Sequence, residues 1–402
     1  MKRESNGAEN ITSVIKRRAK KILSVCIAAV ITAMPFSVCA FATEYQDVDL
    51  KLEDDCRSAI LMEAQTGKIL YEQNADEALP PASVTKVMTL LLVMEAIEAG
   101  QLSLDDTVTA SANACSMGGS QIYLEEGEQM TAEDMLKSVI IASANDAAVA
   151  LAEHVCGTEE AFVEKMNKRA KELGMTNTSF ENTNGLDDTT ENHVTSARDI
   201  AIMSRELLKH EKITEYSSIW QDTIRNGEFT LTNTNRLVRF YNGATGLKTG
   251  STSKAGFCIS ATATRDGMSL ICVIMGADSR DIRNAAAVSL LDWGFANYAV
   301  YRDGEAQIGN IPITGGILSE CSAHSSPFFA VVNKADIKRI ECTTDMPDSL
   351  AAPIYKGDVV GYKVYSLDGK ELGKSEILAD ENVEKIGFSG IIVKILRAMS
   401  FF

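Results

Sequence analysis

Residues 80–100 read PPASVTKVMTLLLVMEAIEAG, and this stretch decides the fold. Its apolar residues follow a helical pattern from Ser83 to Ala99, and the pattern stops at Gly100, where a left-handed cap favours glycine. Ser83 and Lys86 stand three positions apart at the start of that helix, so their side chains lie one above the other. The stretch therefore predicts a helix that presents a serine and a lysine to each other at its first turn.

This serine and lysine are a candidate nucleophile and base. A serine hydroxyl is a poor nucleophile unless a neighbouring group takes its proton. Lys86 can take that proton only as a neutral amine, which requires burial and nearby positive charge. The apolar run Val87–Val93 supplies the burial. Backbone N–H groups at the helix N-terminus favour the negative charge that develops on an attacked carbonyl. The alternative is an ordinary helix start with an exposed lysine, because S-x-x-K is common by chance.

Ser143-Ala144-Asn145 lies 60 residues after Ser83, in a predicted break between helices over Ala132–Ala142 and Asp146–Val155. There it can project two hydrogen-bonding groups into a cleft. Ser143 could relay a proton to a leaving group, and Asn145 could hold Lys86 or a substrate amide. The alternative is helix capping, since serine and asparagine are favoured caps.

Lys248-Thr249-Gly250 lies another 105 residues beyond Ser143, directly before a predicted strand over Gly256–Thr264. A fixed ammonium and a hydroxyl on an edge strand suit the binding of a substrate carboxylate. Gly250 allows a ligand backbone to approach without a side chain in the way. The alternative is a polar turn that enters a hairpin.

The pattern of elements predicts an α+β fold, because strands stand at both ends of residues 43–297 and helices lie between them. Further strands are predicted over Ser58–Met62, Lys68–Glu72 and Ser269–Met275. Further helices are predicted over Glu159–Leu173, Ser196–His210 and Asp281–Asn297. This arrangement favours an antiparallel sheet with a helical subdomain.

Residues 298–383 have a different texture and predict a small all-β domain. Strand-like runs occupy Phe328–Asn333, Ile337–Thr343 and Val359–Leu367. Residues 384–402 then predict an amphipathic helix, with apolar residues on one side and Lys394 and Arg397 on the other. That pattern is typical of a helix lying in the membrane interface. The alternative is a helix docked on the β domain of the same chain.

Residues 1–42 predict an export signal. A basic run, KRRAKK at 16–21, precedes 22 uncharged residues that contain the small-x-small pattern Ala40-Phe41-Ala42. The alternative is an uncleaved membrane anchor, since that uncharged stretch is long enough to span a bilayer. Neither Cys26 nor Cys39 follows a small residue, so a lipoprotein is not indicated.

Charge and metal-binding residues limit the partners. The chain has a net charge of −16; residues 1–42 carry seven basic and two acidic side chains, which leaves −21 on the rest. So acidic a surface repels a phosphate backbone, and we expect no nucleic-acid partner. The histidines lie far apart and no C-x-x-C pair occurs, so we expect no metal site. The seven cysteines beyond residue 42 are irregularly spaced and could be oxidised or buried as thiols.

S-x-x-K, S-x-N and K-T-G in this order are the signature of penicillin-recognising serine enzymes. The chain resembles the low-molecular-mass penicillin-binding proteins that are serine-type D-alanyl-D-alanine carboxypeptidases. The likeness extends through residues 81–89, 142–153, 182–186 and 246–256, and through the trailing β domain and terminal helix. It therefore covers nearly all of the chain beyond the signal.

The resemblance implies a role for each candidate residue. Ser83 forms the acyl-enzyme, Lys86 accepts its proton, and Ser143 and Asn145 assist proton transfer. The substrate-binding residues that the resemblance implies are Lys248, Thr249, Gly250 and Ser251.

Within that group, Lys248 and Thr249 bind the terminal carboxylate, and the backbone N–H groups of Ser83 and Ser251 form the oxyanion hole. Many relatives carry histidine where this chain has Ser251. A backbone role survives that change, although the rate and its pH dependence could differ.

The implied reaction removes the terminal D-alanine from the D-Ala-D-Ala end of peptidoglycan stem pentapeptides, in cell-wall synthesis and remodelling. β-Lactams would acylate the same serine as covalent inhibitors. The implied reaction needs no metal or organic cofactor. Residues 384–402 would attach the exported enzyme peripherally to the outer face of the cytoplasmic membrane.

Two alternatives stay open. A class A β-lactamase shares S-x-x-K and K-T-G but needs a deacylating glutamate, for which Glu191 is the only nearby candidate. The residues around Glu191, the second domain and the tail argue against that enzyme. A penicillin-binding sensor or wall-binding protein without turnover is the non-enzymatic alternative.

Overall fold

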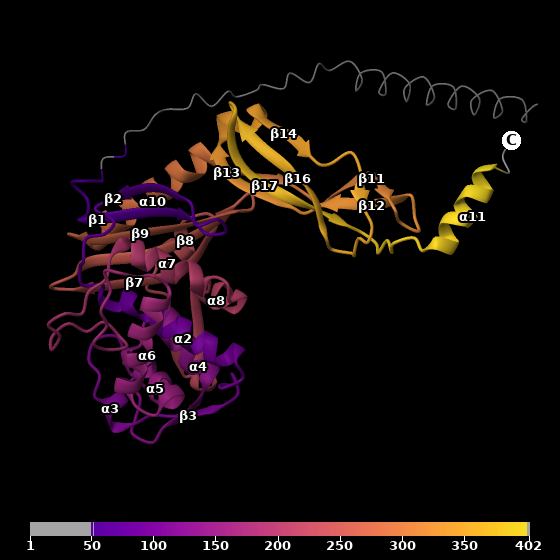
Figure 1. The fold of residues 1–402 in the computed structure, drawn as a ribbon. Helices are drawn as coiled ribbons and strands as arrows, with labels where there is room; N and C mark the ends of the chain where they lie inside the picture. The colour runs from indigo at the N-terminus through magenta and orange to yellow at the C-terminus, as the bar shows by residue number, and fades with distance from the viewer. Residues whose placement is uncertain (1–49, 51, 400–402) are drawn as a thin grey trace, which may run out of the picture. The chain divides into compact units, whose positions relative to one another are not determined.

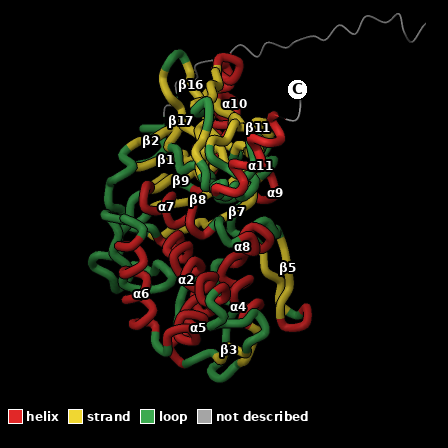
Figure 2. Tube along the Cα trace, turned by 45° about the vertical axis from the view of Figure 1, so that its right-hand side comes forward, coloured by secondary structure: helices red, strands yellow, loops and turns green. Residues whose placement is uncertain are grey.

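The computed structural model describes residues 50 and 52–399 of the 402-residue chain, and Figures 1 and 2 show their arrangement. The predicted export signal lies outside the described residues. Residues 58–277 contain a five-stranded antiparallel sheet in the order β2-β1-β9-β8-β7. Its strands are β1 (Ser58–Glu63), β2 (Ile69–Gln73), β7 (Ala244–Thr252), β8 (Gly256–Arg265) and β9 (Met268–Ala277). The strand β7 forms one edge.

Both faces of this sheet are covered. Successive residues of a strand point to opposite faces, so Ile271 and Val273 of β9 join one hydrophobic core, whereas Cys272 and Ile274 join the other. The helix α10 (Arg280–Asn297) packs on β8 and β9 from the second core, and α7 (Ala197–Leu207) lies on the opposite face (Figure 1). This double burial explains why β9 reads as an unbroken apolar run.

The helical subdomain lies between β2 and β7. Its helices are the 3-10 helix η1 (Ala82–Thr85), α2 (Lys86–Glu98), α3 (Ala112–Cys115), α4 (Ala132–Lys137), the π-helix η2 (Ser138–Ala142), α5 (Asn145–Cys156), α6 (Glu159–Glu172), α7 (Ala197–Leu207), α8 (Glu211–Ser217) and α9 (Leu237–Phe240). Two short antiparallel strand pairs, β3 (Thr107–Thr109) with β4 (Gln129–Thr131) and β5 (Gln221–Ile224) with β6 (Phe229–Thr232), flank them, and the 3-10 turn η3 (Arg225–Gly227) joins the second pair. The predicted α+β architecture is confirmed.

Two predicted helices differ from the structure in ways that matter for the site. The helix predicted from Ser83 begins as the 3-10 helix η1, so Ser83 precedes the α-helix and Lys86 is the first residue of α2. The helix predicted over Ala132–Ala142 divides into α4 and the π-helix η2. A π turn carries one more residue than an α turn, which changes the direction of the chain at its end.

Residues 298–383 form two antiparallel-paired strands and a six-stranded sheet, in the order β14-β16-β17-β12-β11-β15. The strands are β10 (Tyr298–Asp303), β11 (Ala306–Thr314), β12 (Glu320–Ser325), β13 (Phe328–Asn333), β14 (Ile340–Asp345), β15 (Leu350–Ala351), β16 (Val359–Leu367) and β17 (Lys370–Ala379). The strand predicted over Ile337–Thr343 was wrong in its first half. There the 3-10 helix η4 (Lys334–Arg339) forms, with Asp336 paired to Arg339 one turn later.

The terminal helix α11 (Phe388–Met399) displays its apolar side chains to solvent. Phe388 is 81% exposed, and Ile391, the least exposed large apolar side chain of the helix, is still 43% exposed. Lys394 on the polar side donates a hydrogen bond to the carbonyl of Gly316, 3.1 Å away, in the loop after β11. Among the described residues, no helix has the length and apolar character needed to cross a membrane.

Candidate active site

Ser83 and Lys86 meet at the junction of η1 and α2. The Nζ atom of Lys86 lies 2.9 Å from the Oγ atom of Ser83, and the lysine side chain is completely buried. The same Nζ donates to Oδ1 of Asn145 at 2.5 Å and to the carbonyl of Asn184 at 2.8 Å. A neutral amine has two N–H donors and one lone pair. With both donors committed to these two oxygens, the lone pair is left to face the hydroxyl of Ser83.

Burial also favours the neutral form of the Lys86 amine. It lowers the pKa of Lys86 far below its usual value, and the nearby positive charge of Lys248 lowers it further, while the carboxylate of Asp146 opposes the shift. Lys248 is buried as well, and burial lowers its pKa to about 7. Its Nζ atom lies 3.4 Å from the carbonyl of Val139. Two buried lysines therefore share this region, and the charge on one disfavours the charge on the other.

Ser143 stands directly after the π-helix η2 in the left-handed conformation, with φ 62° and ψ 31°. Its Oγ atom is buried and has no hydrogen-bond partner among the described residues. The capping alternative for this motif is wrong, because Ala144 occupies the N-cap of α5 and no side chain caps that end. Asn145 is instead fixed by its Nδ2 donation to the carbonyl of Gly118 at 2.7 Å, which aims Oδ1 at Lys86.

Lys248, Thr249, Gly250 and Ser251 lie inside the edge strand β7, where Thr249 pairs with Ile259 of β8. The alternative of a polar turn is therefore wrong. The hydroxyl of Thr249 donates to that of Thr234 at 2.9 Å. A Cβ atom on Gly250 would lie 2.7 Å from the backbone nitrogen of Ser83, so only glycine allows η1 to approach the strand this closely.

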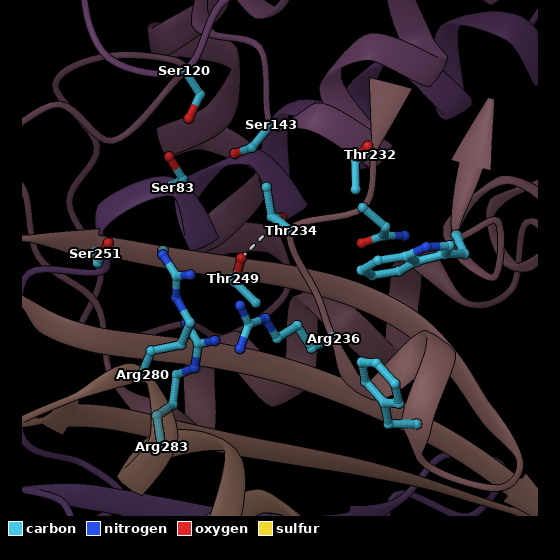
Figure 3. Close-up of a pocket in the computed structure, with 14 residues that line it drawn as sticks. Ser83, Ser120, Ser143, Thr232, Thr234, Arg236, Thr249, Ser251, Arg280 and Arg283 are labelled. Atoms are coloured by element: carbon cyan, nitrogen blue, oxygen red, sulfur yellow. Dashed lines mark hydrogen bonds between the residues drawn. The ribbon is translucent and has the colours of Figure 1, made fainter. Parts of the chain in front are cut away.

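Figure 3 shows the cavity where these elements meet. Of the predicted residues, Ser83, Ser143, Thr249, Gly250 and Ser251 line it. Lys86, Asn145 and Lys248 are buried and do not line it. The cavity wall also contains residues that the sequence did not single out, namely Ser120, Trp220, Thr232, Asn233, Thr234, Arg236, Phe240, Arg280 and Arg283.

The loop at Asn182–Leu186 is a second part of the site whose contribution the sequence did not reveal. Its role depends on backbone atoms: the carbonyl of Asn184 accepts from Lys86, and that of Thr183 accepts from the hydroxyl of Thr89 at 2.5 Å. Gly185 has a φ of +86°, and a Cβ atom there would lie 1.8 Å from the carbonyl oxygen of Ala82. The loop therefore packs closely against η1 and restricts the position of Ser83 in that helix.

We expect Gly250→Ala to slow acylation of Ser83 by about 10²-fold, because the methyl group must displace the backbone of Ser83 and small misplacements of reacting groups are costly. The rate is measured with a labelled penicillin. The control is Gly304→Ala, where no atom lies within 4 Å of the new Cβ atom. Equal acylation rates in both variants would contradict the close contact described above.

His193 supports η1, the helix that contains Ser83, through a hydrogen bond with Thr85. Its Nδ1 atom accepts from the backbone N–H of Glu181 at 2.9 Å, so Nε2 carries the proton and donates to the hydroxyl of Thr85 at 2.7 Å. Burial lowers the pKa of His193 from 6.5 to about 4, although the carboxylates of Glu181 and Asp187 oppose this. The folded protein therefore holds this imidazole neutral.

Acidification should consequently destabilise the protein. Stability is complete above pH 6.5 and falls as the pH drops from 6.5 toward 4, because the unfolded chain binds the proton more readily. Between pH 7 and pH 5 we expect a loss of about 2 kcal/mol in the free energy of unfolding from this group. Urea denaturation of the wild type and of His193→Gln measures it. The same pH slope in both proteins would exclude His193 as the cause.

Comparison with known proteins agrees with this geometry. The sequence profile of the Peptidase_S11 family, described as D-alanyl-D-alanine carboxypeptidase, matches residues 44–279. The chain belongs to this family. A second profile, the C-terminal domain of penicillin-binding protein 5, matches residues 320–385. The family assignment from the three motifs is thereby confirmed, together with the class of enzyme, a serine hydrolase.

Individual relatives of this carboxypeptidase family cover most of the chain. The D-alanyl-D-alanine carboxypeptidase DacF of Bacillus subtilis is 41% identical over 92% of this chain and 96% of its own length. The crystal structure of penicillin-binding protein 5 from Haemophilus influenzae is 32% identical, covers 82% of this chain and 98% of that chain, and superposes with a TM-score of 0.71. Penicillin-binding protein D2 from Listeria monocytogenes, solved with ampicillin bound, is 32% identical, covers 60% of this chain and 97% of that chain, and has a TM-score of 0.55.

Proposed function

We propose that this exported chain removes the terminal D-alanine from peptidoglycan stem pentapeptides through an acyl-enzyme on Ser83. The observation that carries the proposal is the contact between Nζ of Lys86 and Oγ of Ser83, made by a buried amine whose two N–H groups have other acceptors. A lysine held in this way is a proton acceptor at neutral pH, whereas an exposed lysine is not.

The first step is acylation. The neutral amine of Lys86 takes the proton of Ser83 as Oγ attacks the carbonyl between the last two D-alanines. The C–N bond then breaks, and the departing amine must gain a proton. Ser143 is placed to relay it, because its buried hydroxyl lines the cleft and has no partner among the described residues.

Two groups of contacts orient the substrate. The backbone N–H groups of Ser83 and Ser251 are proposed as the oxyanion hole, since Gly250 brings β7 against the backbone nitrogen of Ser83. The hydroxyl of Thr249 and the ammonium of Lys248 are proposed to bind the terminal carboxylate. That carboxylate raises the pKa of Lys248 on binding, because it supplies the opposite charge that the empty site lacks.

The second step is hydrolysis. Water attacks the ester on Ser83, Lys86 accepts a proton from that water, and the trimmed stem leaves with a free carboxylate. β-Lactams are expected to acylate the same serine and to hydrolyse slowly. The relative from Listeria, which was solved with ampicillin, is consistent with this expectation. Glu191, the only candidate for a β-lactamase glutamate, is not among the residues that line the cleft.

One assay separates the three candidate activities. The purified protein is incubated with diacetyl-L-Lys-D-Ala-D-Ala, and in parallel with a labelled penicillin whose release is followed. A carboxypeptidase releases D-alanine and keeps the label for a long time. A β-lactamase releases hydrolysed penicillin rapidly, and a sensor keeps the label without releasing D-alanine. Either of the last two results would overturn the proposal.

We further propose that α11 attaches the enzyme peripherally to the outer face of the cytoplasmic membrane, after export directed by residues 1–42. The exposed apolar side of α11 favours this over docking on the β domain, because its large apolar side chains are at least 43% exposed, whereas Lys394 on the polar side donates a hydrogen bond to Gly316 of that domain. Burying such a side in the interfacial region of a bilayer is favourable in proportion to its area.

Charging that side should release the protein. Ile391→Glu combined with Ile395→Glu is expected to weaken binding to vesicles of anionic phospholipid by on the order of 10²-fold, because two apolar contacts are lost and two negative charges approach an anionic surface. Co-sedimentation measures the binding, and D-alanine release from a soluble peptide serves as the control for folding. Undiminished sedimentation would refute membrane attachment through α11.

A further inference from the structure

Three arginines gather in the same cleft as the nucleophile, and the proposed reaction with its single terminal carboxylate does not use them. Arg236 precedes α9, whereas Arg280 and Arg283 lie in the first turn of α10, and all three line the cavity. In Figure 3 they lie together below Thr249, with Arg280 reaching toward Ser251 and Arg236 approaching from the opposite side. Burial is the main reason that the pKa of Arg283 is lowered to about 10; the charges of Arg280 and Arg236 act in the same direction, whereas Cys258 opposes the shift.

No carboxylate of the described residues neutralises this cluster. Both Arg236 and Arg280 are exposed to solvent, and their side chains form no ion pair or hydrogen bond with any residue that the structure describes. Arg283 is 3% exposed, and its guanidinium donates only to the carbonyl of Cys258 and to Oδ1 of Asn284. The negative charge of Asp281 raises the pKa of Arg283, but the two side chains form no ion pair.

The position of the cluster at a helix N-terminus increases the positive electrostatic potential in the cleft. The N-terminus of a helix carries a partial positive charge, so cations in the first turn are unfavourable, and Arg280 and Arg283 both stand there in the 18-residue helix α10. The rest of the chain beyond residue 42 is strongly acidic, with a net charge of −21. A concentrated cationic patch inside a cleft of an acidic protein attracts anionic ligands into that cleft.

One carboxylate is too small a partner for the cationic groups assembled here. The proposed function assigns the terminal carboxylate to Thr249 and Lys248, and one bidentate guanidinium is enough to engage both oxygens of a carboxylate. We propose that Arg280, supported by Arg283 and Arg236, binds a second carboxylate of the substrate, carried on the side chain of the third stem residue. This inference rests on the proposed function. It assigns the enzyme to stems with a diaminopimelate that keeps its side-chain carboxylate free, in preference to lysine stems.

The location of Arg280 indicates that the carboxylate it binds belongs to the third residue of the stem peptide. Arg280 reaches toward Ser251, whose N–H is proposed to hold the carbonyl of the fourth residue (Figure 3). An extended peptide advances about 3.3 Å per residue, so the third residue is the first whose side chain comes beside Arg280. The second residue, a γ-linked glutamate with its own free carboxylate, lies at least one residue farther away.

The test compares pentapeptides that differ at one group. The third residue is L-lysine, diaminopimelate with a free side-chain carboxylate, or the same diaminopimelate with that carboxylate amidated. A fourth peptide keeps the free diaminopimelate and amidates the second residue. For each peptide, kcat/KM is measured by D-alanine release at low ionic strength and in 1 M NaCl.

We expect the free diaminopimelate peptide to be preferred about tenfold over the lysine and amidated peptides at low ionic strength. The preference should shrink in 1 M NaCl, because exposed guanidiniums are screened over about 3 Å there. In Arg280→Gln the ratio of the two kcat/KM values should fall at least fivefold, toward about one, and Arg280→Lys should retain part of it because the charge remains.

Two features keep the test decisive. Removing a cation from the first turn of α10 does not weaken that helix, so Arg280→Gln is expected to fold. Lys168→Gln removes one exposed positive charge from α6, outside the cleft, and should leave the ratio unchanged. A wild-type ratio near one, or a ratio that Arg280→Gln does not alter, overturns the inference while D-alanine release still supports the proposed function. So does a loss of rate that follows amidation of the second residue alone. Failure to release D-alanine from any peptide overturns the proposed function itself.

Discussion

Ser83→Ala is expected to abolish D-alanine release and covalent labelling by penicillin together. The substitution removes the hydroxyl that lies 2.9 Å from Nζ of Lys86, and no acyl-enzyme can then form. Loss of a nucleophile that acts together with its base lowers kcat by a factor on the order of 10⁴ or more. Release of D-alanine is followed with a coupled amino-acid oxidase, and labelling is followed on a denaturing gel.

The matched control is Ser218→Ala, which removes the same hydroxyl from an exposed serine at the end of α8. This control should retain wild-type rates. Persistent D-alanine release by Ser83→Ala, at a rate that parallels Ser218→Ala, would contradict the mechanism, whatever the result of penicillin labelling.

Lys86→Met should lower the acylation rate by about 10²–10⁴-fold, the usual contribution of a general base. Methionine fills nearly the same buried space, so the loss reports the missing amine and not a cavity. In the wild type, acylation should accelerate with rising pH as Lys86 loses its proton, and this increase begins well below pH 10.5 because the pKa of Lys86 is lowered. Stopped-flow measurements of β-lactam acylation between pH 5 and pH 9 test both statements.

Lys248→Met distinguishes the roles of the two buried lysines. Since Lys248 is proposed to bind the carboxylate, its loss should mainly raise KM for the peptide, whereas Lys86→Met mainly lowers kcat. It should also raise the pKa of Lys86, because one neighbouring positive charge is gone, and so move the acid limb of the profile to higher pH. An unchanged acid limb in Lys248→Met would refute the coupling between the two amines.

The sequence predicted well those features that follow from spacing and hydrophobic pattern. Ser83 and Lys86 are three positions apart, and their contact follows from helical geometry even though the first turn is a 3-10 helix. Burial of Lys86 followed from the apolar run behind it. The antiparallel sheet and the amphipathic terminal helix followed from the alternation and helical periods of their residues.

Other features of the site could not be derived from residue spacing or hydrophobic pattern. Ser143 adopts a positive φ that usually favours glycine, and the π-helix that produces it has the composition of an ordinary helix. Asn184 contributes a backbone carbonyl, which every residue type possesses. Arg236 and Arg280 are 44 positions apart and line the same cavity only because the fold brings their segments together. Such long-range contacts leave no periodic pattern to recognise.

The free edge of β7 has a final consequence. An unpaired strand edge is a template on which any extended chain can add, and many proteins protect such edges against self-association. Here η1 and α8 pack beside β7. Under the proposed function the stem peptide becomes a temporary sixth strand, held by main-chain hydrogen bonds that do not depend on its side chains. Two kinds of contact would therefore recognise the substrate. The backbone of β7 selects an extended peptide, and the charged groups around β7 select the charged groups of that peptide.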